Sequence, residues 1–445
     1  MLPEPLYCCI FVSCCVLNVE VAEVDGGVMT DSRAGQATVR ALYLHIPFCL
    51  RKCAYCDFAS WQTAREDPLM AAYGASLAAQ VQALQHAGLL CETRTAYLGG
   101  GTPTLLPPHA LAALATTVRS ALPVRCELSC EANPESLSDE HLALLAEAGV
   151  TRLSLGVQSL DDDELRALGR IHSAARAEDR VLAALRAGFD VSLDLMCAIP
   201  RQSDSSWQDT LQRAVALGVG HVSVYPLQLE EGTALGDQYG EDEPSWHDPA
   251  VQAARMEAAA TVLEQAGYAR YEVASYARPG KACRHNEAYW TGVGYVGLGT
   301  QAASMLDRAS YQHLRSLCPQ LPPLPTDIAR VRLVCLSTRE ELAASSGLER
   351  LRFDLEFLTE GQAVAEDLML AMRMSAGTDG ELVARARVAL GSSAVDDAVA
   401  LVTRRGLAQW QDGRLVPTHE GWLLGNELYG AFWGLATGEV TTARC

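Results

Sequence analysis

The sequence lacks the features that mark membrane-spanning, secreted and nucleic-acid-binding chains. The apolar stretch at residues 6–17 is too short to cross a bilayer. No Lys or Arg precedes Arg33, although a secretory signal begins with basic residues. Basic side chains are few, with 35 Lys and Arg against 54 Asp and Glu and a net charge of −19. Such an acidic chain is not expected to bind nucleic acid or anionic membranes non-specifically.

Structural disulfides are not expected either, although the chain contains 15 cysteines. Disulfide frameworks belong to small secreted domains, whereas 445 residues can bury a sizeable core. We therefore expect a reducing, cytoplasmic location. Four of the cysteines lie in residues 1–39, which we interpret as a poorly ordered extension or as translation from an upstream start codon, with Met29 as the true start. Palmitoylation of these cysteines is a third interpretation.

Strand-like and helix-like runs alternate regularly through residues 40–276. The short apolar runs lie near residues 41–46, 94–98, 125–131, 151–156, 190–197 and 220–226. Amphipathic segments rich in Ala and Leu lie near residues 68–88, 108–121, 138–148, 161–187, 205–217 and 249–267. Such alternation is typical of βαβ units around a parallel sheet. The sequence therefore predicts an α/β fold built as a full or partial βα barrel.

The pattern changes in the last third of the chain. We expect residues 277–353 to be an irregular linker, since residues 319–325 contain four prolines. Helical periodicity returns in residues 354–445, and residues 408–416 predict a hairpin with Asp412-Gly413 as its turn. These elements indicate a small, helical, winged-helix-like domain. It carries 7 basic against 13 acidic residues, which favours packing or covering a substrate over binding DNA.

One loop carries the strongest chemical signal. Cys49, Cys53 and Cys56 stand at CxxxCxxC spacing directly after the first predicted strand. Three thiolates from one loop can bind three irons of a [4Fe–4S] cluster, which leaves the fourth iron open. An open iron can chelate the amino and carboxylate groups of S-adenosylmethionine (SAM). A structural zinc site is the alternative, but it needs a fourth ligand, and His45 lies on the strand side of the loop.

Polar or glycine-rich features lie after, at the end of, or, for Asp194, within each of the six predicted strands. In βα barrels these strand ends together form the active face. The features are the cysteine loop, Gly99–Thr104, Glu131, Gln158, Asp194 and Tyr225-Pro226. We therefore expect them to share one site, although a triple glycine alone is more often a tight turn.

Individual residues in this set suit a zwitterionic ligand. Glycines let the backbone approach a ligand closely, because no Cβ intervenes. Glu131 can bind a ribose hydroxyl or an ammonium group, or else serve as a helix cap or ion-pair partner. Arg170 and Asp194 offer opposite charges, and a carboxylate in an apolar strand such as that of Asp194 needs a partner.

These residues together resemble the radical SAM superfamily, and within it the oxygen-independent coproporphyrinogen III oxidase-like family, over roughly residues 40–440. The resemblance is carried by Tyr43–Cys49, Gly99–Thr104, Glu131, Gly156–Ser159, Arg170 and Asp194. It implies a partial (β/α)6 barrel with a C-terminal HemN-like domain at 354–445, and a cluster on the three cysteines. It further implies a SAM pocket lined by Tyr43, Gly100, Gly101, Thr102, Glu131, Gln158, Arg170 and Asp194, with Tyr55 packed against the adenine.

Two features point to the haem chaperone subgroup of this family, HemW. The porphyrinogen oxidases have a further cysteine two residues after the third, where this chain has Phe58. Residues 284–290 match the HNxxYW signature of the chaperones. The resemblance implies binding of haem and its delivery to respiratory proteins, with membrane association only through partners; a homodimer stays open. It implies no role for nucleic acid.

Several alternatives stay open at this point. His285 is a candidate axial ligand for haem iron, with Tyr289 and Trp290 stacked on the macrocycle, but a histidine beside aromatic residues is as often structural. Three functions also stay open, and so does the cleavage of SAM. Besides the haem chaperone, the chain could be a coproporphyrinogen III dehydrogenase, which decarboxylates its substrate by radical SAM chemistry. The third function is that of a non-catalytic iron–sulfur scaffold. The chain also departs from its subgroup at residues 198–202, Ala-Ile-Pro-Arg-Gln, where Gly-Leu-Pro-Gly-Gln is usual, so the loop after the fifth strand is expected to shift.

Overall fold

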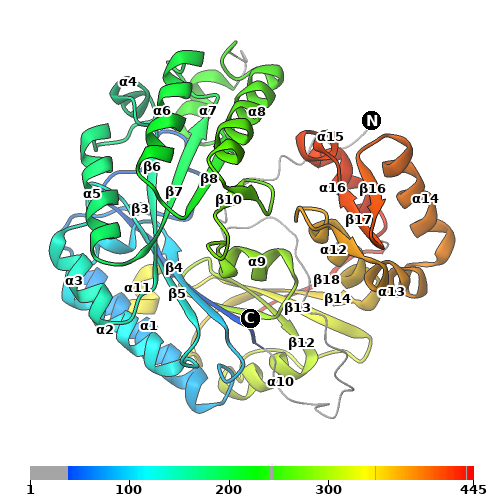
Figure 1. The fold of residues 1–445 in the computed structure, drawn as a ribbon. Coiled ribbons are helices and arrows are strands. Elements are labelled where there is room, and N and C mark those ends of the chain that lie inside the picture. Colours follow the sequence, from blue (N-terminus) through cyan, green and yellow to red (C-terminus); the bar gives the residue numbers. More distant parts are fainter. Residues whose placement is uncertain (1–38, 241–243, 346, 437) are drawn as a thin grey trace.

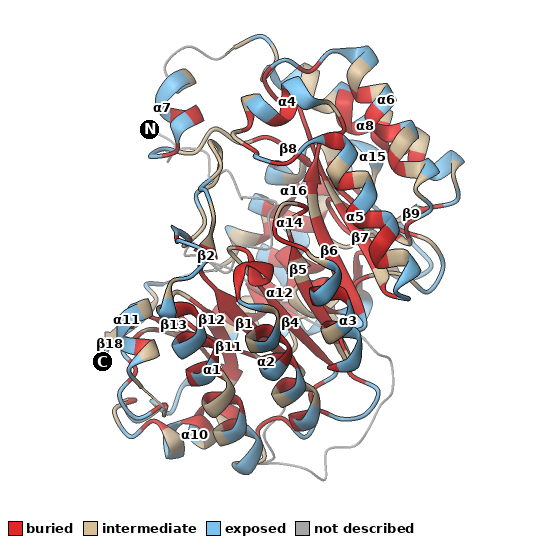
Figure 2. Cartoon of the chain, turned by 90° about the vertical axis from the view of Figure 1, so that its left-hand side faces the viewer, coloured by how far each residue is buried: buried red, intermediate tan, exposed pale blue. Residues whose placement is uncertain are grey.

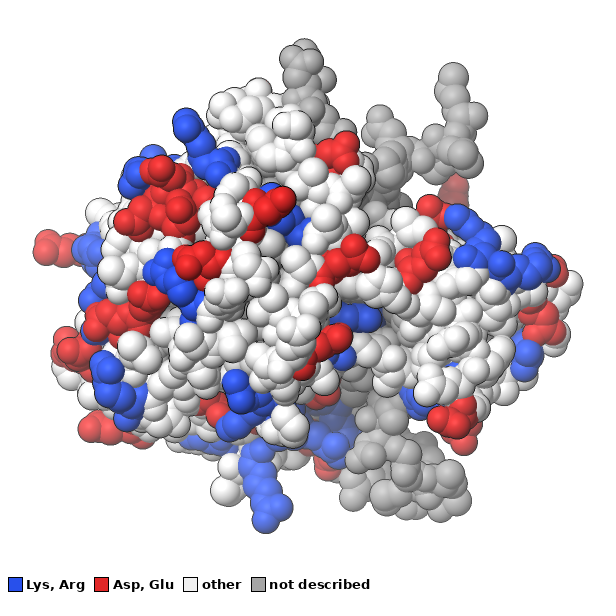
Figure 3. Space-filling view, turned by 45° about the horizontal axis from the view of Figure 1, so that its top comes forward, with Lys and Arg blue, Asp and Glu red and all other residues white. Residues whose placement is uncertain are grey.

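The computed structural model describes residues 39–240, 244–345, 347–436 and 438–445. The predicted extension at residues 1–39 therefore lies outside the described residues, except for Val39. No helix of the described segments combines the length and the apolarity that a membrane span requires. Acidic and basic side chains are interspersed over the face of the molecule in Figure 3.

Six parallel strands form the centre of a 13-stranded sheet, in the order in which they occur along the chain. They are β1 (Ala41–Ile46), β4 (Thr95–Gly100), β5 (Glu127–Ala132), β6 (Arg152–Gln158), β7 (Asp190–Cys197) and β8 (His221–Pro226). All six predicted strands are thus confirmed, with small shifts of their ends. The strands are almost fully buried, as their apolar runs require, and Figure 2 shows them as a buried layer behind half-exposed helices.

Amphipathic helices follow these strands and cover the outer side of the curved sheet (Figure 1). They are α1 (Pro68–His86), α2 (Pro108–Ala121), α3 (Asp139–Glu147), α4 (Asp162–Ala167), α5 (Ala174–Arg186), α6 (Asp204–Ala216), α7 (Ala234–Tyr239) and α8 (Pro249–Gln265). The helix predicted at 161–187 is two helices. Gly169 has φ +75°, which ends the first, and the Ser173 side chain accepts from the amide of Arg176 and so caps the second.

The partial barrel is extended at both edges. On one side, β11 (Tyr295–Leu298) pairs parallel to β1, and antiparallel strands follow in the order β12 (Ala303–Asp307), β13 (Ile328–Cys335), β14 (Phe353–Thr359) and β18 (Thr441–Arg444). On the other side lie β10 (Ser275–Ala277) and β9 (Ala269–Arg270). The cysteine loop joins two short strands, β2 (Phe48–Cys49) and β3 (Trp61–Gln62), and a 3₁₀ turn at Pro103–Leu105 follows β4.

Residues 277–353 contain more regular structure than an irregular linker. They hold α9 (Arg284–Trp290), α10 (Arg308–Leu317) and α11 (Arg339–Ala343) besides three strands of the main sheet. The strand β13 alternates buried and half-buried residues, because it lies near an edge and only one face is fully covered. Its arginines interrupt the apolar run that would identify a strand in the sequence.

The C-terminal region has a second hydrophobic cluster, which also includes Val273 and Met305. It contains α12 (Glu360–Ala371), α13 (Gly380–Leu390), α14 (Ser392–Arg404), α15 (His419–Leu423) and α16 (Gly425–Trp433), with a sheet of β15 (Thr378–Asp379), β17 (Arg414–Pro417) and β16 (Ala408–Gln411). The predicted hairpin is confirmed, since β16 and β17 pair around Asp412 and Gly413 at φ +49° and +79°. The strand β14, which spans the predicted boundary at residue 354, belongs to the main sheet.

Candidate functional site

A cavity opens inside the barrel at the carboxyl ends of the parallel strands. Ten predicted site residues line it: Cys49, Cys53, Tyr55, Cys56, Gly100, Gly101, Glu131, Gln158, Arg170 and Asp194. They come from the cysteine loop, from the ends of β4, β5 and β6, from the interior of β7, and from the segment after α4. These residues therefore line one common cavity.

The cysteine loop is held against the barrel by backbone hydrogen bonds at its centre. The amide of Ala54 donates to the carbonyl of Leu168 (3.0 Å), and its carbonyl accepts from Leu235 (2.8 Å). All three cysteine side chains are half-buried and face the cavity. The fixed centre of the loop leaves its thiols at the rim of the cavity.

Two polar groups approach the thiols from the barrel. Nη1 of Arg170 lies 3.3 Å from Sγ of Cys53, and Oγ1 of Thr102 lies 3.6 Å from Sγ of Cys49. Burial raises the pKa of Cys49, and raises that of Cys56 to about 12. Thiolates at these positions therefore need positive charge beside them, which iron and Arg170 can supply.

The residues present fit an iron–sulfur cubane. No three His, Cys, Asp or Glu side chains of the described residues are grouped to hold a single metal ion. A cubane differs from a single ion, because each thiolate binds its own iron. One protein loop supplies three thiols here, and the cavity beside them leaves space at a fourth corner.

The glycine loop after β4 brings the backbone close to the cavity. Gly100 has φ +109°, and a Cβ there would lie 2.4 Å from the ring of His45. A Cβ on Gly101 would lie within 3.0 Å of the backbone of Phe48 and of Ile46. Side chains are therefore excluded at both positions, and the close packing places this loop beside the cysteines.

Two carboxylates face the cavity from neighbouring parts of the sheet. Glu131 accepts a hydrogen bond from the amide of Gly100 (2.8 Å), and Asp194 accepts one from Oγ of Ser154 (3.1 Å). Burial raises the pKa of Glu131 to about 7 and that of Asp194 to about 6. Ammonium, sulfonium or hydroxyl groups would stabilise the ionised forms, so the pair fits the polar groups of SAM.

Arg170 does not pair with Asp194 directly. Its Nη2 donates to Oδ1 of Asn133 and to the carbonyl of Gly156, both at 2.7 Å. Nδ2 of Asn133 in turn donates to Oγ1 of Thr102 (2.8 Å). Asn133 thus links the arginine to the residue beside Cys49, a role that the sequence analysis missed although Asn133 stands only two residues after Glu131.

Gln158 adopts a strained backbone at the end of β6. Its φ is +68°, and the pairing of β6 with β7 shifts by a residue between Gly156 and Gln158. Its Oε1 is buried without a hydrogen-bond partner among the described residues. Strain at a residue that lines a cavity is typical of functional positions, and the orphaned oxygen suits a donor on a ligand.

Tyr55 lies at the apolar side of the cavity. It packs against a small cluster formed by Leu168, Met196, Ile199, Leu227 and Leu235. A flat ring such as adenine would find an aromatic and aliphatic surface here. Three predicted residues do not line the cavity themselves: Tyr43, Thr102 and His285. Thr102 supports Cys49, and Tyr43 stacks on Tyr97, which does face the cavity.

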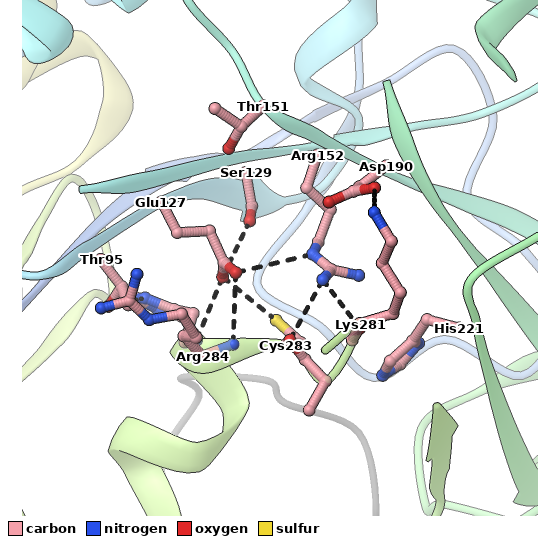
Figure 4. Close-up of polar contacts among 12 residues, drawn as sticks. Thr95, Glu127, Ser129, Thr151, Arg152, Asp190, His221, Lys281, Cys283 and Arg284 are labelled. Carbon is pink, nitrogen blue, oxygen red and sulfur yellow. Dashed lines mark hydrogen bonds and ion pairs between the residues drawn. The ribbon is translucent and has the colours of Figure 1, made fainter. Parts of the chain in front are cut away.

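The helix α9, which carries the HNxxYW sequence, closes the opposite end of the barrel. Figure 4 shows the polar contacts that hold its N-terminus. The carboxylate of Glu127 accepts from the amides of Arg284 (3.4 Å) and His285 (3.3 Å), and lies 3.8 Å from Nε of Arg152. Nη2 of Arg152 donates to the carbonyls of Lys281 (2.8 Å) and Ala282 (3.1 Å). The sequence analysis missed both Glu127 and Arg152, which begin β5 and β6.

His285 points into the closed end and is fully buried. Its Nδ1 lies 3.0 Å from Oγ1 of Thr95, and its ring stacks on Tyr97 at 5.0 Å. Burial lowers its pKa to about 3, so the imidazole is neutral. Its Nε2 has no hydrogen-bond partner in the part of the chain that the structure describes. The free nitrogen suits an iron ligand chemically, but it is enclosed, so haem could reach it only if α9 moved.

The loop after β7 keeps a glycine-type conformation without glycines. Ala198 and Arg201 have φ +54° and +74°, at the positions where the subgroup usually has Gly. Gln202 supports this loop, since its Oε1 accepts from the amide of Ala198 at 2.8 Å. Two non-glycine residues of this loop are therefore strained, and the expected shift of the loop stays a prediction.

The comparisons with known proteins agree with this geometry. The model of the Radical SAM superfamily matches residues 43–214, and fold and site together define a radical SAM protein. The chain is 30% identical to the heme chaperone HemW of Bacillus subtilis (strain 168) over 404 residues, covering 89% of this chain and all of that one. It is 42% identical to HemW of Mycobacterium tuberculosis over 270 residues, covering 59% of this chain and 68% of that one. The chain belongs to the HemW family of radical SAM proteins.

Two further proteins are similar to this chain over part of their length or in fold alone. A mitochondrial radical S-adenosyl methionine domain-containing protein 1 from Bos taurus is 38% identical over 284 residues, which is 63% of each chain. The chain thus matches less than two thirds of the length of this relative. The structure of coproporphyrinogen III oxidase (HemN) from Escherichia coli superimposes with a TM-score of 0.70 at 20% identity, covering 89% of this chain and 90% of that one. This second likeness, at 20% identity, concerns the fold alone.

Proposed function

We propose that this chain is a haem chaperone that binds a [4Fe–4S] cluster and SAM inside its barrel and passes haem to an acceptor protein. The similarity to heme chaperones named HemW, which for the Bacillus subtilis protein extends over the whole relative, carries this proposal. The position of Phe58 at the cavity supports it, since the porphyrinogen oxidases have a cysteine there.

Each side chain around the cavity has a distinct task in this proposal. Cys49, Cys53 and Cys56 hold the cluster, and Arg170 balances its negative charge. When bound, the cluster supplies the electron that radical SAM proteins pass to SAM. Glu131 and Asp194 orient the polar groups of SAM, and the glycine loop lets it approach the backbone. The identity of the acceptor protein and the formation of a homodimer are parts of this proposal that the cavity does not address.

One experiment separates this function from its catalytic rival. The protein, reconstituted without oxygen, is mixed with SAM, a strong reductant and coproporphyrinogen III, and protoporphyrinogen and methionine are followed by chromatography. A parallel titration with haem is followed by absorbance. We expect haem binding without decarboxylation of the porphyrinogen. Decarboxylation over multiple turnovers would make the chain a coproporphyrinogen III dehydrogenase despite Phe58.

Ligation of haem iron by His285 is a separate part of the proposal. Replacing His285 by Ala removes the imidazole that α9 directs into the barrel. We expect the absorbance spectrum of bound haem to change and its affinity to fall, whereas His109→Ala, at an exposed histidine that contacts Glu140, changes neither. An unchanged spectrum and affinity in His285→Ala would assign the residue to the packing of the closed end.

A further inference from the structure

A second groove lies on the outer side of α9, away from the cavity. One wall is formed by α9 and by residues that precede β1 and β4, and the other by residues 371–377 and Arg414 of the C-terminal region. The helix therefore presents His285 to the interior of the barrel and Arg284 and Trp290 to this groove. We call it the arginine groove.

The charge of the arginine groove is opposite to that of the chain. Four arginines line it, Arg40, Arg94, Arg284 and Arg414, against a single acid, Glu287. The whole chain carries −19. A cluster of positive charge in so acidic a protein requires a reason, and binding of an anion is the simplest one.

These arginines are only partly neutralised by the protein. Arg40 pairs with Glu92 (3.0 Å), and Nε of Arg414 donates to the carbonyl of Ala376 (2.8 Å). Within the described residues, the guanidinium of Arg284 donates to the backbone carbonyl of Arg125 at 3.5 Å, and its charge also acts on Glu287. Within the described residues, no side-chain hydrogen bond or ion pair is recorded for Arg94, which is exposed. Arg94 and Arg284 therefore retain donors for a ligand.

The groove also has a flat apolar surface. Trp290 is half-buried in its wall, with Ala288, Val293 and Met374 beside it. Nε1 of Trp290 donates to Glu272 (3.1 Å), which fixes the plane of the indole. The guanidinium of Arg373 lies over one face of the ring, 5.1 Å from its centroid, so a ligand would use the opposite face. An aromatic plane next to unpaired arginines matches a flat molecule with carboxylates at its edge, because guanidinium groups bind carboxylates in pairs of parallel hydrogen bonds.

We infer that the arginine groove binds the carboxylate edge of a dicarboxylic tetrapyrrole, with Arg94 and Arg284 on its propionates and its ring against Trp290. This inference rests on the proposed function, since haem is such a molecule. It does not use His285, because that imidazole faces the interior of the barrel, so the groove and His285 are alternative places for haem. It places the tetrapyrrole outside the barrel, between α9 and the C-terminal region, rather than among the residues that line the cavity.

The test uses the full chain and two probes that differ only in charge: haem and its dimethyl ester, whose propionates are neutral. Binding of each is measured by absorbance titration for the wild type, for Arg94→Gln/Arg284→Gln, and for the control Arg186→Gln/Arg404→Gln. The control arginines are exposed and lie outside the groove. Melting temperatures of all three proteins verify that the exposed substitutions leave the fold intact.

We expect the wild type and the control to bind haem at least tenfold more tightly than the ester. The groove variant should lose about tenfold in affinity for haem and none for the ester, so that it no longer distinguishes the two probes. Two results would contradict the inference about the groove: equal haem binding in all three proteins, or a wild type that binds haem and ester alike. Neither result would contradict the proposed haem chaperone function. A wild type that binds neither probe would overturn both.

Discussion

The two ends of the barrel use polar residues in opposite ways. At the carboxyl ends of the strands, glycines and a strained glutamine surround a cavity, and the carboxylates there hold raised pKa values. At the amino ends, Glu127 and Arg152 are directed at the backbone around α9, aromatic rings pack beside them, and the inner end of the same cavity is lined by Arg152, Cys283 and Asn286. The first end is built to receive a ligand and the second to close the barrel, which agrees with the usual division of function and stability in βα barrels.

The largest effect should come from removing the thiols at the open end. Replacing Cys49, Cys53 and Cys56 together by Ser should reduce bound iron and sulfide to near zero after reconstitution, because alkoxide is a poor substitute for thiolate. The half-buried side chains are not part of the core, so the melting temperature of the metal-free protein should change little. Iron and sulfide assays with calorimetry check both points.

The exposed Cys91 provides the control for this triple variant, since Cys91→Ser should keep the full iron content. Iron retained by the triple variant would place the cluster on other cysteines and remove the main difference between the two ends.

A large effect is also expected at the closed end, but on stability. Glu127→Ala leaves Arg152, whose side chain is 4% exposed, without its carboxylate, and leaves two amides of α9 without an acceptor. Breaking a buried ion pair from one side costs about 3–5 kcal/mol. We expect a lower denaturation midpoint in urea with an unchanged iron content, and a smaller loss for Glu127→Gln, which keeps an acceptor.

If Glu127→Ala instead loses its cluster while keeping its denaturation midpoint, the closed end would not be a separate structural unit. Cluster binding at the open end would then depend on the contacts at the closed end.

The open end could be predicted from the sequence and most of the closed end could not. Parallel strands bring successive strand ends to one edge, so Cys49, Glu131 and Asp194 could be assigned to one site from their positions alone. The contact of Glu127 with α9 joins residues more than 150 positions apart, and no local pattern indicates it. The edge strands were missed for a related reason, since their half-covered faces carry arginines.

A smaller, pH-dependent effect should separate the open end from the closed end. The pKa of Glu131 is about 7 in the folded, ligand-free protein against 4.5 for the free side chain, so the folded state binds its proton more tightly. Its contribution to stability is therefore present below about pH 4.5 and is lost as the pH rises through 7. We expect the ligand-free wild type to lose stability between pH 5 and 8 by an amount on the order of 3 kcal/mol.

Glu131→Gln cannot ionise, so its melting temperature should fall less over the same range, while Glu127→Gln at the closed end should follow the wild type. Saturating SAM should flatten the wild-type profile, since a cationic ligand stabilises the carboxylate. Parallel profiles for the wild type and Glu131→Gln would mean that Glu131 titrates normally and that its burial does not prepare it for a cation.

The smallest effect concerns the strain that the open end retains in the loop after β7. Ala198 and Arg201 hold positive φ values that cost an L-residue about 1–2 kcal/mol each, and glycine would relieve this at an entropic cost of about 0.4–1 kcal/mol. Arg201 is exposed, so Arg201→Gly should raise stability by about 0.5–1 kcal/mol in urea denaturation.

Arg201→Ala distinguishes strain from the side chain, because it removes the guanidinium and keeps the conformational cost. If the backbone is the cause, the alanine variant should match the wild type and only the glycine variant should gain stability. A gain in both variants would assign the effect to the arginine, and a loss in the glycine variant would mean that the side chain fixes the loop. Strain confined to the backbone would show that the residues of this loop do not themselves favour its positive φ values. Gln202 and the surrounding barrel would then impose the conformation.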